Sequence, residues 1–374
     1  MRLLLGLPAL LCLLLAVGIL YQYAGGLRDR LRFIRQGRRV KIANGKWLYL
    51  CERGSDGPTI IFEAGIGATS QNWHGLQEDL AGVARTVAYD RGGLGWSSSQ
   101  WTTERTPSNI ALELHQMLRA ARIDPPYLMV GHSFGGLVVR RFAAEYPDEV
   151  SGVVLVDPMR PEEWPPLNED ARKLVDRGVR LLGIAVPLAW FGLARLIATS
   201  MLCRSGSIAR TVSRSAGDGG EHVLDRLTSE LNKMPREIWP VVAAHWSNPH
   251  FYRGMVAHLK AVPASVLEME NAAPIEDAPV VLLTPHSAAP LSADTLRRVG
   301  ANTQQIIAHS SGHWIHLDEP ELVRGAIQAM IEQNGLHTNT RMSAPAEIAV
   351  AVASDADEFL DGNAGVAAGF AAGA

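Results

Sequence analysis

The chain has 374 residues, 47% of them apolar and 20% charged, so it can bury the core of one large domain with insertions or of two modest domains. This composition excludes a wholly disordered or collagen-like polymer. Basic residues number 35 against 38 acidic ones, and this near balance argues against nucleic acid as a partner. Three cysteines occur, Cys12, Cys51 and Cys203, without a CxxC pair, which excludes a disulfide scaffold and a thiolate zinc site.

An uncharged apolar stretch, residues 3–27, opens the chain. A helix rises about 1.5 Å per residue, so about 20 such residues cross the roughly 30 Å hydrocarbon layer of a bilayer. Residues 1–27 are therefore predicted to form a transmembrane anchor or a signal segment. The basic residues between Arg28 and Lys41 favour retention on the cytoplasmic side of the membrane, and the tyrosines before Ala24 make a poor cleavage site.

These features predict a membrane-anchored protein whose remaining domains lie in the cytoplasm. Secretion after cleavage of a signal peptide is the alternative. Residues 27–41 have an alternative interpretation too, as a short basic amphipathic helix that lies on anionic lipid.

The middle of the chain alternates between short apolar strands and amphipathic helices. Strands are predicted as a hairpin within residues 40–50 that turns at Asn44-Gly45, and at 59–63, 86–89, 127–130, 152–156, 280–283 and 303–308; helices are predicted at 73–80, 107–121, 136–146 and 320–333. This alternation is typical of a mostly parallel sheet that helices cover on both faces.

Residues 159–274 interrupt the alternation, and we interpret them as a helical lid inserted between two core segments, residues 28–158 and 275–335. Within this lid, residues 186–202 carry no charge except Arg195. Such an apolar run fits an ordinary lid core, an acyl-binding tunnel or a second membrane contact. Residues 336–374 are small and polar, and we expect a disordered tail.

The chemistry centres on residues 131–136, Gly-His-Ser-Phe-Gly-Gly, which lie between a predicted strand and a predicted helix. A serine at this junction stands in a tight, strained turn at the carboxyl edge of the sheet, and the glycines let neighbouring backbone approach. Ser133 is therefore the candidate nucleophile. It needs a base within hydrogen-bond reach, because a serine hydroxyl is a poor nucleophile at neutral pH.

Four motifs in this order resemble the α/β-hydrolase fold superfamily, in its serine hydrolase, esterase-like branch, over residues 40–334 without the lid. Residues 62–67 resemble its oxyanion loop, residues 89–97 the turn after its fourth strand, residues 131–135 its nucleophile elbow and residues 311–315 its final histidine loop. The resemblance implies an α/β class fold, a mostly parallel α/β-hydrolase sheet with helices on both faces and a helical lid inserted after the sixth core strand.

The chain order expected in this fold is serine, acid, histidine. Among the 12 histidines, His313 follows the last predicted strand in a glycine-containing loop, which makes it the candidate base. His132 is interpreted as a packing or turn residue, and His309 and His316 as loop residues beside the base. His286 follows a strand at the carboxyl edge and is a candidate to line the pocket.

The acid has two candidates, Asp157 and Asp294. Many relatives carry the acid after the penultimate strand, but residues 284–293 contain no carboxylate, and Asp294 is explained as a cap at a helix start. Asp157 ends the strand after the nucleophile, a position that some branches of the superfamily use. It would hold the tautomer of the histidine, or else only cap the following turn.

Two backbone N–H groups, those of Ile66 and Phe134, are expected to form the oxyanion hole. Asp90 and Arg91 are interpreted as turn and ion-pair residues near the site. No metal or organic cofactor is expected, because the sequence contains no ligand cluster and no dinucleotide fingerprint in a suitable context.

The sequence therefore predicts a serine hydrolase that cleaves an ester or related acyl bond of a small molecule through an acyl-enzyme intermediate. A lipid-like substrate is one alternative within this class. Alternatives within the fold are carbon–carbon bond hydrolysis, cofactor-free peroxidation and aminopeptidase action. Epoxide hydrolase and dehalogenase chemistry is disfavoured, because those relatives carry an aspartate where this chain has Ser133. A non-catalytic, membrane-tethered binding protein is the alternative from another class.

Overall fold

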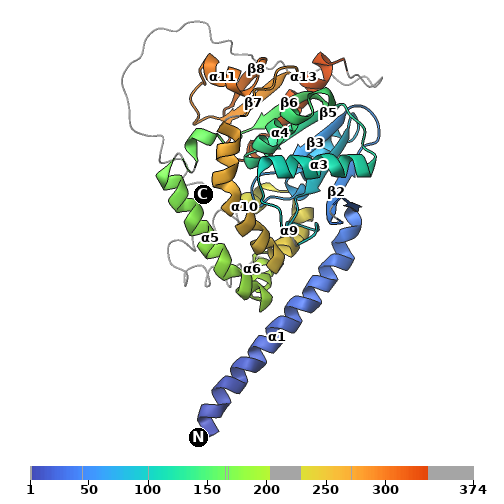
Figure 1. Cartoon of the computed structure of the whole chain (residues 1–374). Helices are drawn as coiled ribbons and strands as arrows, with labels where there is room; N and C mark the ends of the chain where they lie inside the picture. Colours follow the sequence, from blue (N-terminus) through green and yellow to red (C-terminus); the bar gives the residue numbers. More distant parts are fainter. Residues whose placement is uncertain are drawn as a thin grey trace.

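The computed structural model describes residues 2–335 apart from residues 44, 100, 165, 167, 203–228 and 271. Within these residues, eight strands form one sheet in the order β1-β2-β4-β3-β5-β6-β7-β8, with helices on both faces (Figure 1). β2 is antiparallel to β1 and to β4, and the other neighbouring strands are parallel. The strands are β1 (Arg38–Lys41), β2 (Trp47–Arg53), β3 (Thr59–Glu63), β4 (Arg85–Asp90), β5 (Tyr127–His132), β6 (Val150–Val156), β7 (Val280–Pro285) and β8 (Thr303–Ala308).

Two apolar layers, one on each face, hold helices to the sheet. One layer packs α3 (Pro107–Ala121) and α4 (Phe134–Glu145) against β5 and β6, and the other packs α2 (His74–Leu80) and α13 (Pro320–Gln333) on the opposite face. Successive side chains of a strand point to opposite faces, so strands with no polar face, such as β5, are buried on both sides. The predicted mostly parallel α/β sheet is confirmed.

Predicted elements and observed ones agree closely in the core. The hairpin at residues 40–50 is the β1–β2 pair; of its predicted turn, Gly45 has a φ of +76° and Asn44 lies outside the described residues. The short helices α11 (Ala293–Val299) and α12 (Ile315–Asp318) flank β8, and short 3₁₀ helices lie at Ile34–Gln36, Ser70–Trp73, Pro147–Glu149, Pro161–Glu163 and Arg236–Ile238.

Helices follow β6, the sixth strand of the chain, before β7 begins. The helices are α5 (Glu169–Trp190), α6 (Leu193–Leu202), α9 (Trp239–Trp246) and α10 (Pro249–Glu270), and α10 packs along α5. The apolar run at residues 186–202 is not one helix, because α5 ends at Trp190 and α6 leaves it at 95°.

The N-terminal helix α1 (Arg2–Phe33) extends from the body of the molecule, with the N-terminus at its far end (Figure 1). It continues past Leu27, and residues 38–41 form β1, so the interpretation of residues 27–41 as a separate amphipathic helix is wrong. The helical segment 8–36 is long enough to cross a membrane, and its most apolar 18 residues have a mean hydropathy of 1.9, a property that anchors and signal sequences share. The predicted tail, residues 336–374, lies outside the described residues.

Candidate active site

Ser133 stands at the junction between β5 and α4, with a φ of 53° and a ψ of −123°. A residue with a side chain rarely adopts this conformation, which costs about 1–3 kcal/mol and persists only where the surroundings hold it. Here the N–H of Ser133 donates to the oxygen of Val156 at 3.1 Å, and its own oxygen accepts from the N–H of Met159 at 3.0 Å. The backbone of the serine is thus fixed by the residues on both sides of Asp157.

Gly135 lets the elbow pack directly on the loop that follows β3. A Cβ atom at Gly135 would lie 2.4 Å from the oxygen of Glu63 and 2.6 Å from that of Ala64, closer than real Cβ atoms come to other atoms. Only glycine fits at this position, and the close approach brings the start of α4 beside the loop that carries Ile66.

His313 lies in the loop between β8 and α12, and its Nδ1 is 2.7 Å from Oδ2 of Asp157. Asp157 directly follows β6, has a φ of 39° and donates its N–H to the oxygen of Leu283 on β7 at 2.8 Å. Parallel strands end at one edge of a sheet, so Ser133, Asp157 and His313 come from three such ends. All three are partly exposed, as a reacting group must be to meet its substrate.

Asp294, the other candidate acid, lies in the first turn of α11. Its side chain is exposed, and its Oδ1 is 2.5 Å from Nη2 of Arg297, one turn along the same helix. This ion pair lowers the pKa of the Asp294 carboxyl. The structure therefore brings Asp157 to His313, while Asp294 contacts its own helix.

Two further histidines hold the loop of His313 in place. Nε2 of His132 is 2.9 Å from the backbone oxygen of His313, and Nδ1 of His286 is 3.0 Å from that of Ser311. Carbonyl oxygens accept only, so each of these nitrogens carries a proton and donates it. The packing interpretation of His132 thus omitted a hydrogen bond, and His286 contacts the loop and is not among the residues that line the cavity beside Asp157.

His316 is buried behind this loop, where its ring packs against those of Trp73 and His132 at centroid distances of 4.6 and 4.4 Å. Burial, with a smaller contribution from His313, lowers its pKa to about 3. His316 is therefore neutral at physiological pH, whereas His309 is exposed in the same loop region.

Arg91 holds the loop that follows β3 and carries Ile66. Its Nη2 contacts the backbone oxygens of Ala64 and Gly65, and its Nε is 2.9 Å from Oε1 of Glu63, with both side chains almost fully buried. In a trans peptide the C=O and the following N–H point in opposite directions. Because Arg91 binds the C=O of Gly65, the N–H of Ile66 points to the side of the loop opposite Arg91. Phe134 is the first residue of α4, where an N–H has no helical acceptor.

The ion pair expected for Arg91 is present, but sequence reasoning did not identify its partner, Glu63. Glu63 is the last residue of β3, and Arg91 directly follows the last residue of β4, its parallel neighbour. The pairing of these two strands would have predicted that Glu63 and Arg91 lie close together. Burial raises the pKa of Glu63, while Arg91 opposes that rise. Asp90 accepts hydrogen bonds from the N–H groups of Ser70 and Trp96, in agreement with its expected role in a turn.

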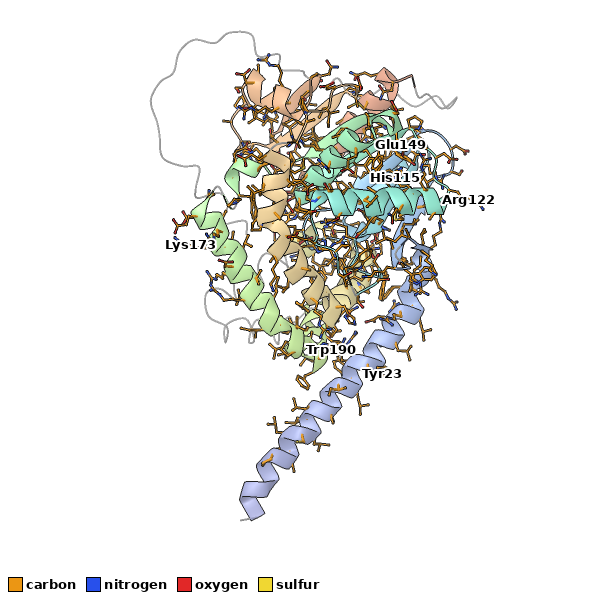
Figure 2. The ribbon with its side chains drawn as sticks, viewed as in Figure 1. Tyr23, His115, Arg122, Glu149, Lys173 and Trp190 are labelled. Carbon is orange, nitrogen blue, oxygen red and sulfur yellow. The ribbon has the colours of Figure 1, made fainter. Side chains whose placement is uncertain are left out.

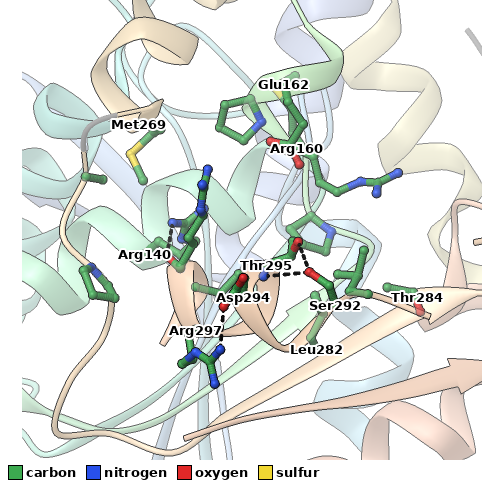
Figure 3. A pocket seen from close by; sticks show the side chains of 18 of the residues that line it. Arg140, Arg160, Glu162, Met269, Leu282, Thr284, Ser292, Asp294, Thr295 and Arg297 are labelled. Atoms are coloured by element: carbon green, nitrogen blue, oxygen red, sulfur yellow. Dashed lines mark hydrogen bonds and ion pairs between the residues drawn. The ribbon is translucent and has the colours of Figure 1, made fainter. Parts of the chain in front are cut away.

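A cavity of about 830 Å³ adjoins the site on the Asp157 side (Figure 3). Its walls come from α4, the segment after β6, the end of α10, β7 and α11. They include Arg140, Arg160, Met269, Leu282 and Asp294. Ser133 and His313 are not among its lining residues, so the cavity touches the candidate triad only through the acid.

Among the residues that the structure describes, no three His, Cys, Asp or Glu side chains are grouped as a metal ion would require.

The model of a family described as the alpha/beta hydrolase fold matches residues 58–190. YqjL of Bacillus subtilis (strain 168) is 40% identical over 106 residues, 28% of this chain and 42% of YqjL. An "AB hydrolase superfamily protein" of Gibberella zeae is 32% identical over 120 residues, 31% of this chain and 37% of that protein. "Putative carbamate hydrolase RutD" of Escherichia coli O9:H4 is 30% identical over 136 residues, 36% of this chain and 49% of RutD. The chain thus spans less than half the length of these relatives.

Solved structures extend the likeness to most of the chain. The epoxide hydrolase CorEH superposes with a TM-score of 0.59 and 15% identity, over 79% of this chain and 98% of CorEH. An esterase of Exiguobacterium antarcticum has a TM-score of 0.55 and 14% identity, over 79% of this chain and 99% of the esterase. At such low identities the likeness shows the fold, which is that of the α/β-hydrolases.

Proposed function

We propose that this protein of the α/β-hydrolase fold superfamily is a serine hydrolase that cleaves an ester or related acyl bond. Ser133 is the nucleophile, His313 the base, and Asp157 the acid that orients the base. The observation that carries the proposal is the 2.7 Å hydrogen bond between Asp157 and His313, together with the strained backbone of Ser133, whose N–H donates to the residue before Asp157. Carboxylate, imidazole and hydroxyl in this order make a serine nucleophilic at neutral pH.

The hydrogen bond to Asp157 determines which nitrogen of His313 acts as the base. A carboxylate accepts only, so Nδ1 carries the proton in the neutral ring and Nε2 has a lone pair with which to act as base. Nε2 takes the proton of Ser133 as Oγ attacks the acyl carbon, and Asp157 stabilises the imidazolium that forms. The proton passes to the leaving alcohol oxygen as its bond to carbon breaks.

The N–H groups of Ile66 and Phe134 donate hydrogen bonds to the negatively charged oxygen of the tetrahedral intermediate. A donor aimed at the developing charge lowers the barrier by about 3 kcal/mol, because it needs no reorientation during the reaction. Arg91 acts through the backbone and holds the N–H of Ile66 in place. A water molecule, deprotonated by Nε2 of His313, then attacks the acyl-enzyme and releases the acid.

The comparisons support hydrolysis of a small molecule, since carbamate hydrolase and esterase are both names of acyl-cleaving enzymes. The epoxide hydrolase of the same fold is weaker support for epoxide chemistry, because a serine stands at the nucleophile position of this chain.

We further propose that residues 159–274 act as a lid over the core segments 28–158 and 275–335. The helix α1 would anchor the protein, with the hydrolase domain in the cytoplasm.

Hydrolysis of p-nitrophenyl esters of increasing chain length tests this function. Wild-type protein should release p-nitrophenol, while Ser133→Ala and His313→Ala should reduce the rate to that of the esters in buffer. A preference for long acyl chains would identify a lipid-like substrate. No turnover with any ester, from folded wild-type protein, would favour the non-catalytic binding protein.

A further inference from the structure

The corner where α5 meets α6 is apolar and exposed. Within residues 181–202, which we call the α5–α6 corner, Arg195 is the only charged residue. Large apolar side chains of this corner face outward: Leu181, Ile184, Leu188, Trp190, Phe191 and Leu196. Soluble proteins seldom gather so many exposed apolar groups without a partner, so this surface needs an occupant.

The single charge of the corner is turned inward, onto α1. Arg195 is only 5% exposed; its Nη1 is 2.6 Å from Oδ2 of Asp29, and its Nε donates to Oε1 of Gln22 at 3.1 Å. Gln22 in turn donates to the backbone oxygen of Ser247. Asp29 therefore neutralises Arg195 inside the protein, and no other residue of the corner is charged. A cation from outside the corner, the exposed guanidinium of Arg253 on α10, lies 5.7 Å from the centre of the Trp190 ring.

The corner meets α1 within the uncharged part of that helix. A Cβ atom at Gly18 would lie 2.3 Å from the oxygen of Phe191, so the two backbones touch where only a glycine fits. Gly18 precedes Arg28, the first charge after the apolar stretch, by ten residues, which is about 15 Å along a helix. The point of contact is thus well inside the part of α1 that would lie in lipid.

We infer that the α5–α6 corner is embedded in the same leaflet of the lipid bilayer as the C-terminal half of the apolar stretch of α1. The inference rests on the proposed anchoring by α1, because the contact at Gly18 then places the corner at the depth of lipid. Figure 2 shows Tyr23 of α1 and Trp190 of the corner at the same end of the body, in agreement with the contact between these two segments. Two attachments in one bilayer hold the hydrolase domain in a fixed orientation.

The test places an environment-sensitive NBD label on single cysteines of the full chain, with Cys12, Cys51 and Cys203 replaced by alanine. Ile184→Cys reports on the corner and Leu14→Cys on α1, and both side chains are exposed, so the label should not disturb folding. Leu112→Cys on α3 is the matched control, a leucine that is also exposed but lies away from the corner. The protein is reconstituted into phosphatidylcholine–phosphatidylglycerol vesicles that contain lipids with a doxyl quencher in the acyl chain.

We expect the labels at positions 14 and 184 to shift to the blue and to be quenched several-fold more than the label at position 112. Quenching at 14 but not at 184 would overturn the inference and leave the anchor intact. A blue shift at 184 without lipid quenching would overturn it too, in favour of a protein that covers the corner. Absence of quenching at both positions would contradict anchoring and insertion together, and would leave the hydrolase proposal unaffected.

Discussion

Asp157 and His313 are 156 residues apart in the chain, yet Oδ2 of the one lies 2.7 Å from Nδ1 of the other. The sheet creates this proximity: Asp157 leaves β6 and His313 lies in the loop after β8, with β7 between these two strands. Asp157 also follows Val156, whose oxygen accepts the N–H of Ser133. The end of β6 therefore contacts both residues, Ser133 through the backbone of Val156 and His313 through the carboxylate of Asp157.

Asp157→Asn should lower kcat by about 10³–10⁴-fold with little change in stability, because an amide favours the wrong tautomer of His313. The measurement is ester hydrolysis at saturating substrate, with circular dichroism to verify folding. Asp294→Asn is the matched control and should retain wild-type turnover. The reverse result would transfer the role of the acid to Asp294.

Gly135→Ala should destabilise the protein and abolish turnover, because the added methyl group would meet the oxygens of Glu63 and Ala64. Backbone on both sides would have to shift, which displaces Ser133 from the loop of Ile66. Gly75→Ala is the control: its Cβ would meet nothing within 4 Å, and alanine in a helix gains about 0.5–1 kcal/mol over glycine. Urea unfolding and ester hydrolysis would measure both effects; a fully active Gly135→Ala enzyme would contradict the account of the elbow.

Arg91→Lys should reduce kcat and leave KM nearly unchanged, because a lysine keeps the charge opposite Glu63 but cannot hold two backbone oxygens and the carboxylate together. Loss of stability alone would not give this pattern. Arg105→Lys removes a similarly buried arginine, paired with Glu113 through two hydrogen bonds, outside the oxyanion loop. It should lower the unfolding midpoint without changing kcat, and equal kcat losses in both variants would exclude a positioning role for Arg91.

Acid should destabilise the fold in part through His316, whose pKa burial depresses to about 3 from 6.5. Below pH 6.5 the unfolded chain takes up a proton that the folded protein does not, so stability falls as the pH drops from about 6.5 toward 3. The advantage of wild type over His316→Phe in unfolding free energy should decrease by about 2 kcal/mol from pH 7 to pH 5. Guanidinium unfolding at both values measures it, and a constant difference would mean that His316 does not contribute.

Most of the sheet and the serine elbow could be predicted from the sequence, because their signals are local. The strand at 59–63 and the helix at 107–121 have the predicted bounds, since apolar runs and the start at Pro107 define them without help from distant residues. Likewise, a Gly-x-Ser-x-Gly turn needs only its own strand and helix to be recognised.

Contacts between distant segments escaped sequence reasoning. The pair of Glu63 and Arg91 depends on which strands are neighbours, and the clamp of Arg195 on Asp29 depends on how α6 meets α1. The bend at Gly192, where φ is +79°, also divided what looked like one apolar run. For the acid, the chain order alone left Asp157 and Asp294 open, because only the sheet determines which carboxylate reaches His313.

The nucleophilic character of Ser133 is tested most directly by a fluorophosphonate probe, which forms a covalent bond with a serine that an adjacent base has activated. Wild-type protein incubated with the probe should gain one adduct, located by peptide mass spectrometry on Ser133. Ser133→Ala and His313→Ala should gain none, although 21 other serines remain in the former. Folded wild-type protein that stays unlabelled, or an adduct on a different serine, would contradict the account.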